Sequence, residues 1–260
     1  MAVCEAVPLF DANAFVGRAA ERQPGAPVDA RGLREELNAL GIERALVYYS
    51  AAVRGDILAG NRRLLEELAG VQGLEPCWVL LPSDTGEVPP PDTLVGDMLA
   101  AGVRAARLFP RTHGYQVRVR VLGPLLTALA RRRVPLFLDF GIVHWSERYF
   151  DWDGVAEICQ AYPDLSVVLV RPGLMLDRDL YPLMAQCPNL YVETSYYFVH
   201  QGLRALAARF GAERILWGTG MPAYDPGAAI ALLTYSGLRW EEQSLVGNGN
   251  LQRLLGRVRP

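Results

Sequence analysis

Eight short apolar runs, each followed by a stretch with helical character, set the strongest limit on how this chain of 260 residues can fold. The runs are mostly apolar throughout, which is typical of parallel strands that are buried on both faces. The expected strands cover residues 7–11, 44–49, 75–81, 104–109, 135–140, 165–170, 190–195 and 214–218.

The stretches between these runs have the spacing of amphipathic helices. Residues 31–40 and 55–70 place apolar side chains at i, i+3 and i+4. The remaining expected helices cover 91–102, 123–133, 152–162, 177–186, 199–211, 226–237 and 241–256. Gly41, Gly102 and Gly211 each fall between a helix and the following strand, as helix-terminating glycines do.

Eight β-then-α units in a chain of this length predict an α/β fold of the (β/α)8 TIM-barrel type, with residues 1–260 forming a single domain. A doubly wound open sheet is the main alternative. It agrees less well with the sequence, because no glycine-rich phosphate loop follows any of the expected strands. We interpret the proline-rich segment 82–92 as a loop within the domain.

Composition excludes several classes of function. A net charge of -2 and a pI of about 6.0 give no indication of binding to nucleic acid or to an anionic membrane. No apolar run is long enough to span a bilayer, and the N-terminus lacks the features of a signal peptide. The four cysteines are far apart, which is typical of reduced thiols in a cytoplasmic protein. All 26 basic residues are arginines, so Schiff-base chemistry on lysine is excluded.

Six segments carry motifs at expected strand ends and in the last helix. They are "FDANAFVG" (10–17), "VPLFLDFG" (134–141), "LSVVLVRPG" (165–173), "NLYVETS" (189–195), "FGAERILWGTGMP" (210–222) and "VGNGNLQRLLG" (246–256). Together they resemble the amidohydrolase-related family, which includes metal-dependent hydrolases and aromatic-acid decarboxylases. The last two are the most specific, because they are similar to the family motifs FGxxRxLFGSDxP and GNAxRLL. The resemblance implies a TIM barrel with hydrolase or lyase chemistry.

The resemblance also implies a metal site, and here the sequence departs from the family pattern. The family's metal-binding positions on strands one, five, six and eight hold Asn13, Phe15, Asp139, Arg171 and Gly220. Phe and Gly cannot bind a metal, and Arg is a fixed cation. Zinc needs about three or four imidazole, thiolate or carboxylate ligands. We therefore expect no metal and no other cofactor. Magnesium or calcium on the remaining oxygen donors is an alternative that the two nearby arginines, Arg107 and Arg171, disfavour.

Polar residues remain at the expected C-terminal strand ends, where TIM barrels build their active sites. The catalytic candidates, as general acids or bases, are Asp139, Glu193 and His144. The candidates for substrate binding are Arg171, Arg107, Asn13, Asp11 and Tyr196. Because guanidinium groups match carboxylate and phosphate groups, the two arginines indicate an anionic ligand. We expect Asp139 and Arg171 to lie within salt-bridge reach of each other or of a shared anion.

Two functions agree with this pattern. The first is a metal-independent hydrolase or lyase acting on a small, anionic organic substrate at the barrel mouth. The second is a non-catalytic barrel that binds a ligand or a partner protein. In this case, an ion pair between Asp139 and Arg171 fills the space of the lost metal site and carries out no chemistry. An open pocket bordered by Asp139 and Glu193 would favour the enzyme, and a mouth filled by side chains would favour binding. The sequence leaves the oligomeric state open, a homo-oligomer included.

Overall fold

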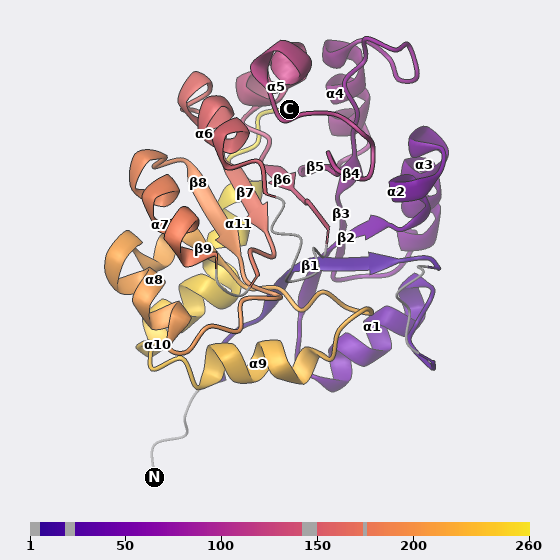
Figure 1. The fold of residues 1–260 in the computed structure, drawn as a ribbon. Helices are drawn as coiled ribbons and strands as arrows, with labels where there is room; N and C mark the ends of the chain where they lie inside the picture. The colour runs from indigo at the N-terminus through magenta and orange to yellow at the C-terminus, as the bar shows by residue number, and fades with distance from the viewer. Residues whose placement is uncertain (1–5, 19–23, 142–149, 174–175) are drawn as a thin grey trace.

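The computed structural model describes residues 6–18, 24–141, 150–173 and 176–260, and it shows parallel strands surrounded by helices (Figure 1). Each strand pairs in parallel with its neighbour in the chain, except across the two seams described below. The strands are β1 (Phe10–Val16), β2 (Arg44–Tyr49), β3 (Leu74–Pro76), β4 (Trp78–Val79), β5 (Ala106–Leu108), β6 (Leu136–Leu138), β7 (Val167–Val170), β8 (Leu190–Glu193) and β9 (Ile215–Leu216).

Two seams decide whether this sheet is open or closed. At the first, β3 and β4 are the halves of the one strand expected at 75–81, and the Cys77 N–H between them donates to the Val47 carbonyl at 2.8 Å. At the second, the Ala12 N–H of β1 donates to the Trp217 carbonyl just after β9 at 2.9 Å. The sheet therefore closes on itself, and the predicted (β/α)8 barrel is confirmed.

The helices follow the strands as the spacing predicts, with two differences. The expected helix 241–256 is divided by a π-helical turn at Leu245–Gly249, and the short helix α2 after β2 was not expected. The helices are α1 (Ala30–Ala39), α2 (Ala51–Arg54), α3 (Ile57–Leu68), α4 (Pro91–Ala100), α5 (Val119–Arg132), α6 (Trp152–Ala161), α7 (Asp177–Gln186), α8 (Gly202–Phe210), α9 (Pro226–Thr234), α10 (Trp240–Ser244) and α11 (Asn250–Gly256). Within the described ranges, no helix has both the length and the apolar character needed to cross a bilayer.

Alternation along the strands divides the core into two layers. Outward-facing residues pack against the helices, while inward-facing residues such as Phe10 and Phe137 fill the barrel. Three leucines of α11, Leu251, Leu254 and Leu255, join the inner layer next to Phe10, the first residue of β1. Figure 1 shows α11 crossing one end of the strands. The N-terminal end of the barrel is thus closed by apolar packing, and the C-terminal mouth is the end where a site can form.

Candidate functional site

Three charged side chains form a buried ion-pair triad at the mouth. Arg171 follows β7, and its Nη2 donates to both carboxylate oxygens of Asp139 at 2.7 Å. Arg107, on β5, places its Nη2 2.9 Å from Asp139 Oδ2. Asp139 and Arg107 are each 1% exposed, and Arg171 is 9% exposed. The predicted salt bridge between Asp139 and Arg171 is confirmed, with Arg107 as a second partner.

The triad has a fixed charge state. Burial opposes ionisation of Asp139, but the guanidinium groups of Arg171 and Arg107 hold the pKa of its carboxyl below the usual value. Burial would by itself lower the pKa of Arg171, and the adjacent Asp139 carboxylate raises it instead. One carboxylate therefore lies between two guanidinium ions, which keep their charge in proteins. The triad carries a net positive charge, and Arg171 is its most exposed member.

The direction of Arg171 does not follow from strand alternation. Val168 and Val170 face the barrel interior, whereas Leu169 packs in the outer layer. Arg171 shares parity with Leu169, so strand alternation alone would point its side chain outward, toward the helices. A backbone φ of 53° instead turns the side chain toward the mouth. This left-handed conformation costs a non-glycine residue about 1–3 kcal/mol, and such strain is concentrated at functional positions.

A second buried network surrounds Glu193 at the end of β8. Its Oε1 accepts from the Ser195 N–H at 2.6 Å, and its Oε2 accepts from Asn13 Nδ2 at 3.1 Å and from Ser195 Oγ at 3.0 Å. Asn13 Oδ1 accepts from Arg107 Nη2 at 2.7 Å, which joins this network to the triad. Burial raises the pKa of Glu193 to about 7, against the lowering effects of the Ser195 N–H and the arginines.

Asp11 serves to hold β1 against the end of β9. Its Oδ1 accepts from the backbone N–H groups of Asn13 at 2.8 Å and Thr219 at 2.9 Å, and its Oδ2 accepts from the Thr219 hydroxyl. Burial raises the pKa of the Asp11 carboxyl. The side chain is fully buried and lies within the seam that closes the barrel. These contacts give Asp11 a structural role, which is to join β1 to the segment after β9.

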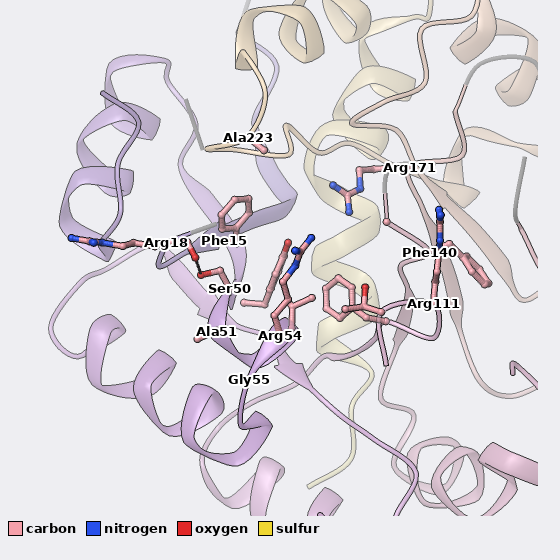
Figure 2. A pocket seen from close by; sticks show the side chains of 15 residues that line it. Phe15, Arg18, Ser50, Ala51, Arg54, Gly55, Arg111, Phe140, Arg171 and Ala223 are labelled. Atoms are coloured by element: carbon pink, nitrogen blue, oxygen red, sulfur yellow. Dashed lines mark hydrogen bonds between the residues drawn. The ribbon is translucent and has the colours of Figure 1, made fainter. Parts of the chain in front are cut away.

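A cavity of about 860 Å³ opens at the mouth (Figure 2). Four arginines line it, namely Arg18, Arg54, Arg111 and Arg171. Four aromatic rings line it as well, namely Phe15, Tyr48, Phe109 and Phe140. Its described lining contains no acidic side chain. A cavity with cationic groups set among aromatic rings fits an anionic molecule that also has an apolar part.

Of the residues that we expected at the site, Arg171 lines this cavity. Asp139 and Glu193 lie in the buried networks beneath it, as do Asn13 and Asp11, and all four are at most 2% exposed. Arg107 lies under the cavity with its Cζ 4.4 Å from the centre of the Tyr48 ring, so it supports that ring from below.

Two further candidates lie elsewhere. The Tyr196 ring packs against Phe198, with ring centres 5.6 Å apart, and against Tyr224 at 5.5 Å, and it does not belong to the cavity lining. His144 lies outside the described residues.

Sequence reasoning missed most of the cavity wall. Tyr48 is the last residue but one of β2, Arg54 lies in the unexpected helix α2, and Arg111 follows β5. A signal was present for Arg111 and Tyr48, because both fall at the C-terminal end of an expected strand, where barrel loops build sites. Arg54 gave no such signal, since only the folded position of α2 brings it to the mouth.

A family model described as amidohydrolase matches residues 22–256. The chain therefore belongs to the amidohydrolase family, and the resemblance inferred from the motifs is confirmed. The match begins after β1, so it does not include the "FDANAFVG" segment. Among curated proteins, no sequence matches this chain.

Solved structures share the fold over nearly the whole chain. An uncharacterised TIM-barrel protein of Bordetella bronchiseptica is 17% identical with a TM-score of 0.76, covering 96% of this chain and 99% of its own. The 5-carboxyvanillate decarboxylase of Sphingomonas paucimobilis is 15% identical with a TM-score of 0.73, covering 97% and 100%. A dihydroxybenzoic acid decarboxylase of Polaromonas, with bound manganese and the inhibitor 2-nitroresorcinol, is 16% identical with a TM-score of 0.72, covering 96% and 97%.

The residues at the mouth do not fit a divalent cation such as that manganese. Both oxygens of Asp139 accept hydrogen bonds from Arg171, and Asn13 Oδ1 accepts one from Arg107. A metal ion would have to displace these donors and lie beside two guanidinium charges. Across the described ranges, no group of three or more His, Cys, Asp or Glu side chains is arranged to hold a metal.

Position 220 adds a steric argument to the electrostatic one. Gly220 has a φ of 72°, and a Cβ atom added there would collide with the ring of Tyr224. The Tyr224 ring thus fills the space that a carboxylate side chain at position 220 would need. Burial raises the pKa of the Tyr224 phenol to about 12, so this group stays neutral next to Arg171.

We expect protein purified without added metal to contain well below one equivalent of zinc or manganese per chain. The reason is the donor set at the mouth, where guanidinium groups already occupy the carboxylate and amide oxygens. Elemental analysis after gel filtration measures this directly. One tightly held metal ion per chain that is lost on Asp139→Ala substitution would show that the interpretation is wrong.

Proposed function

We propose that the mouth of this barrel binds a small anionic organic molecule with an apolar or aromatic part, and that it does so without a metal. Arg171 carries the proposal. One edge of its guanidinium is held by Asp139, and the side chain also lines the cavity. A fixed guanidinium gives an anion the positive field that a metal ion would otherwise supply, with no cofactor to bind.

The relatives support the choice of ligand class. Two of the similar structures are decarboxylases named for aromatic carboxylic acids. In this chain, a carboxylate on Arg171 would leave an attached ring among Phe15, Tyr48 and Phe109. The Tyr48 ring already contacts Phe15 and Phe109, with ring centres 5.5 Å and 5.4 Å apart. An aromatic acid therefore suits both the charge and the apolar wall of the cavity.

The state of the carboxylates favours ligand binding over catalysis. Asp139 is fully engaged by two arginines, and Glu193 is enclosed by Asn13 and Ser195. Neither carboxylate lines the cavity. A general acid or base must reach the proton that it transfers. The non-catalytic binding barrel is therefore the function that the geometry supports best.

A metal-independent hydrolase or lyase is the second candidate, and Glu193 favours it. A carboxyl with a pKa of about 7 is poised to accept or donate a proton near neutral pH. For this function, Glu193→Gln should abolish turnover of aromatic acids, measured as release of carbon dioxide or of a hydrolysed product. Under the binding function, no aromatic acid is turned over and Glu193→Gln leaves ligand affinity within about twofold.

Arg171→Met is expected to weaken the binding of benzoate by about tenfold or more, because a charge-assisted hydrogen bond and a full positive charge are lost. Isothermal titration calorimetry measures the affinity, with benzamide as an uncharged comparison. Arg131→Met is a matched control, since that side chain is 68% exposed and does not belong to the cavity lining. Wild-type and Arg171→Met proteins that bind benzoate equally and melt at the same temperature would contradict the proposal.

Two broader properties are part of the proposal. A cytoplasmic location is supported by Cys77, Cys159 and Cys187, which are buried free thiols. Assembly into a homo-oligomer stays a prediction, to be measured by light scattering.

A further inference from the structure

We propose that anion binding at the barrel mouth is coupled to proton binding at Glu193, so that the protein takes up protons as the ligand binds and releases the ligand as the pH rises above neutrality. This inference rests on the anion-binding function above and concerns the regulation of the same site. Such coupling requires Glu193 to be close to Arg171, to change the charge at the mouth when it ionises, and to titrate near neutral pH.

Glu193 lies next to the arginine that carries the binding function. Arg171 follows β7, which pairs with β8, and its N–H donates to the Glu193 carbonyl at 3.2 Å. Asn13 connects the Glu193 side chain to the triad, because it donates to Oε2 at 3.1 Å and accepts from Arg107 Nη2 at 2.7 Å. Arg107 and Arg171 both contact Asp139. Glu193 and Arg171 are therefore linked by buried side chains in direct contact.

The ionisation of Glu193 changes the net charge of these groups. With Glu193 protonated, two guanidinium ions oppose the single carboxylate of Asp139, and an anion meets a net positive charge. With Glu193 ionised, two carboxylates balance the two guanidinium ions. The influence acts in both directions, because Arg171 and Arg107 lower the pKa of the Glu193 carboxyl. An anion on Arg171 would weaken this effect and so raise the affinity of Glu193 for a proton.

The charged groups around Glu193 come from several neighbouring strands. Arg107 on β5 and Arg171 after β7 keep their charge, and Asp139 on β6 has a lowered pKa and is ionised. Asp11 on β1 is buried, its own pKa is raised, and its charge raises the pKa of Glu193. Burial is the largest influence and brings the pKa of Glu193 to about 7. Glu193 therefore changes its charge near neutral pH.

The hydrogen bonds of Glu193 accommodate both of its ionisation states. The carboxylate accepts from the Ser195 N–H at 2.6 Å, and Ser195 Oγ lies 3.0 Å from its Oε2. A hydroxyl can donate to a carboxylate or accept from a protonated acid. Asn13 Nδ2 also donates to Ser195 Oγ at 2.9 Å, so Asn13 is held in both states. A proton can therefore bind and leave while Asn13 keeps its contact with Arg107.

Calorimetry on the full wild-type chain with benzoate tests the coupling. Benzoate stays ionised above about pH 6, so a change in affinity comes from the protein. Relative to about pH 6, we expect the affinity to fall by less than about twofold at pH 7 and by about tenfold at pH 9, a coupling of ordinary size. At about pH 7.5, close to half a proton should be taken up for each ligand bound. The heat of binding should therefore differ between imidazole and Tris, two cationic buffers whose ionisation heats differ.

Two variants show whether Glu193 is the titrating group. Glu193→Gln has a neutral side chain of the same size and should bind benzoate with one affinity across the whole pH range. Glu66→Gln makes the same chemical change at an exposed position on α3 and should keep the pH dependence of the wild type. An equal fall in affinity in the wild type and in Glu193→Gln would overturn the coupling, since another group would then be titrating.

The wild type alone also decides the matter, without any variant that has to fold. A wild-type affinity that stays constant with pH, or a heat of binding that is the same in both buffers, would overturn the coupling while the anion-binding function stands. Absence of benzoate binding at every pH would overturn the anion-binding function, and the coupling with it.

Discussion

Asp139→Asn is expected to lower the free energy of unfolding by about 3–5 kcal/mol, because it leaves Arg107 and Arg171 buried without their counter-charge. The asparagine keeps the size of the side chain and one acceptor oxygen. The lost stability therefore comes from the removed charge and not from a change in side-chain volume. Urea unfolding at neutral pH, followed by circular dichroism, measures the effect. This loss is large compared with the total stability typical of a domain.

Two comparisons make the result specific to the buried charge. Glu66→Gln removes one partner of an exposed ion pair, Arg63–Glu66, and should change the stability far less than Asp139→Asn does. Adding Arg171→Met to Asp139→Asn should recover part of the lost stability, because one uncompensated charge is removed with its partner. If Asp139→Asn costs as little as Glu66→Gln, water solvates the triad and it is not the dry ion-pair cluster described above.

Wild-type protein is expected to lose about 3 kcal/mol of stability relative to Glu193→Gln as the pH rises from about 4 to about 8. The folded-state pKa of Glu193, about 7, is above the ordinary value of 4.5 for a glutamate side chain. The stability that comes from the bound proton is therefore complete below the lower value and is lost as the pH rises through the higher one. The size follows from about 1.4 kcal/mol for each unit of pKa difference.

The comparison with Glu193→Gln isolates this group from two other buried carboxyls. Asp11 also has a raised pKa, so its contribution has the same sign as that of Glu193. Asp139 has a lowered pKa, so its contribution is lost as the pH falls. Both occur in the wild type and in the variant and cancel in the difference. A difference in unfolding free energy that stays constant across the pH range would mean that the pKa of Glu193 is the same in the folded and the unfolded protein.

The order of elements could be predicted because its signals are local. Short apolar runs specify buried strands, and Gly41, Gly102 and Gly211, all with positive φ, end the helices where expected. The details that differ arise from pairing between elements. The expected first strand ended at Asp11, whereas β1 continues to Val16 because it pairs with β2 as far as Tyr49. The expected third strand is divided at Cys77, next to Pro76, which has no N–H to donate.

The site could be predicted only where a strand end identifies it. Asp139 and Arg171 fall at the ends of neighbouring strands, so their pairing followed from the order of the strands alone. The inward turn of Arg171 depends on its backbone φ, which the surrounding structure imposes. The position of Arg54 in the cavity wall depends on how α2 packs against the barrel. The periodicity of apolar residues in the sequence does not predict this packing.

The ring of Tyr224 over Gly220 makes the changes at this mouth dependent on their order. A carboxylate introduced at position 220 would collide with that ring, and removing the ring first would leave a void beside Arg171. Replacing Arg171 by histidine would leave Arg107 as the remaining cation on Asp139. Each single step toward a metal centre therefore meets a penalty that the other steps would have to relieve. In genetic terms the positions are epistatic, and an engineer who wants a metalloenzyme from this barrel must exchange them together.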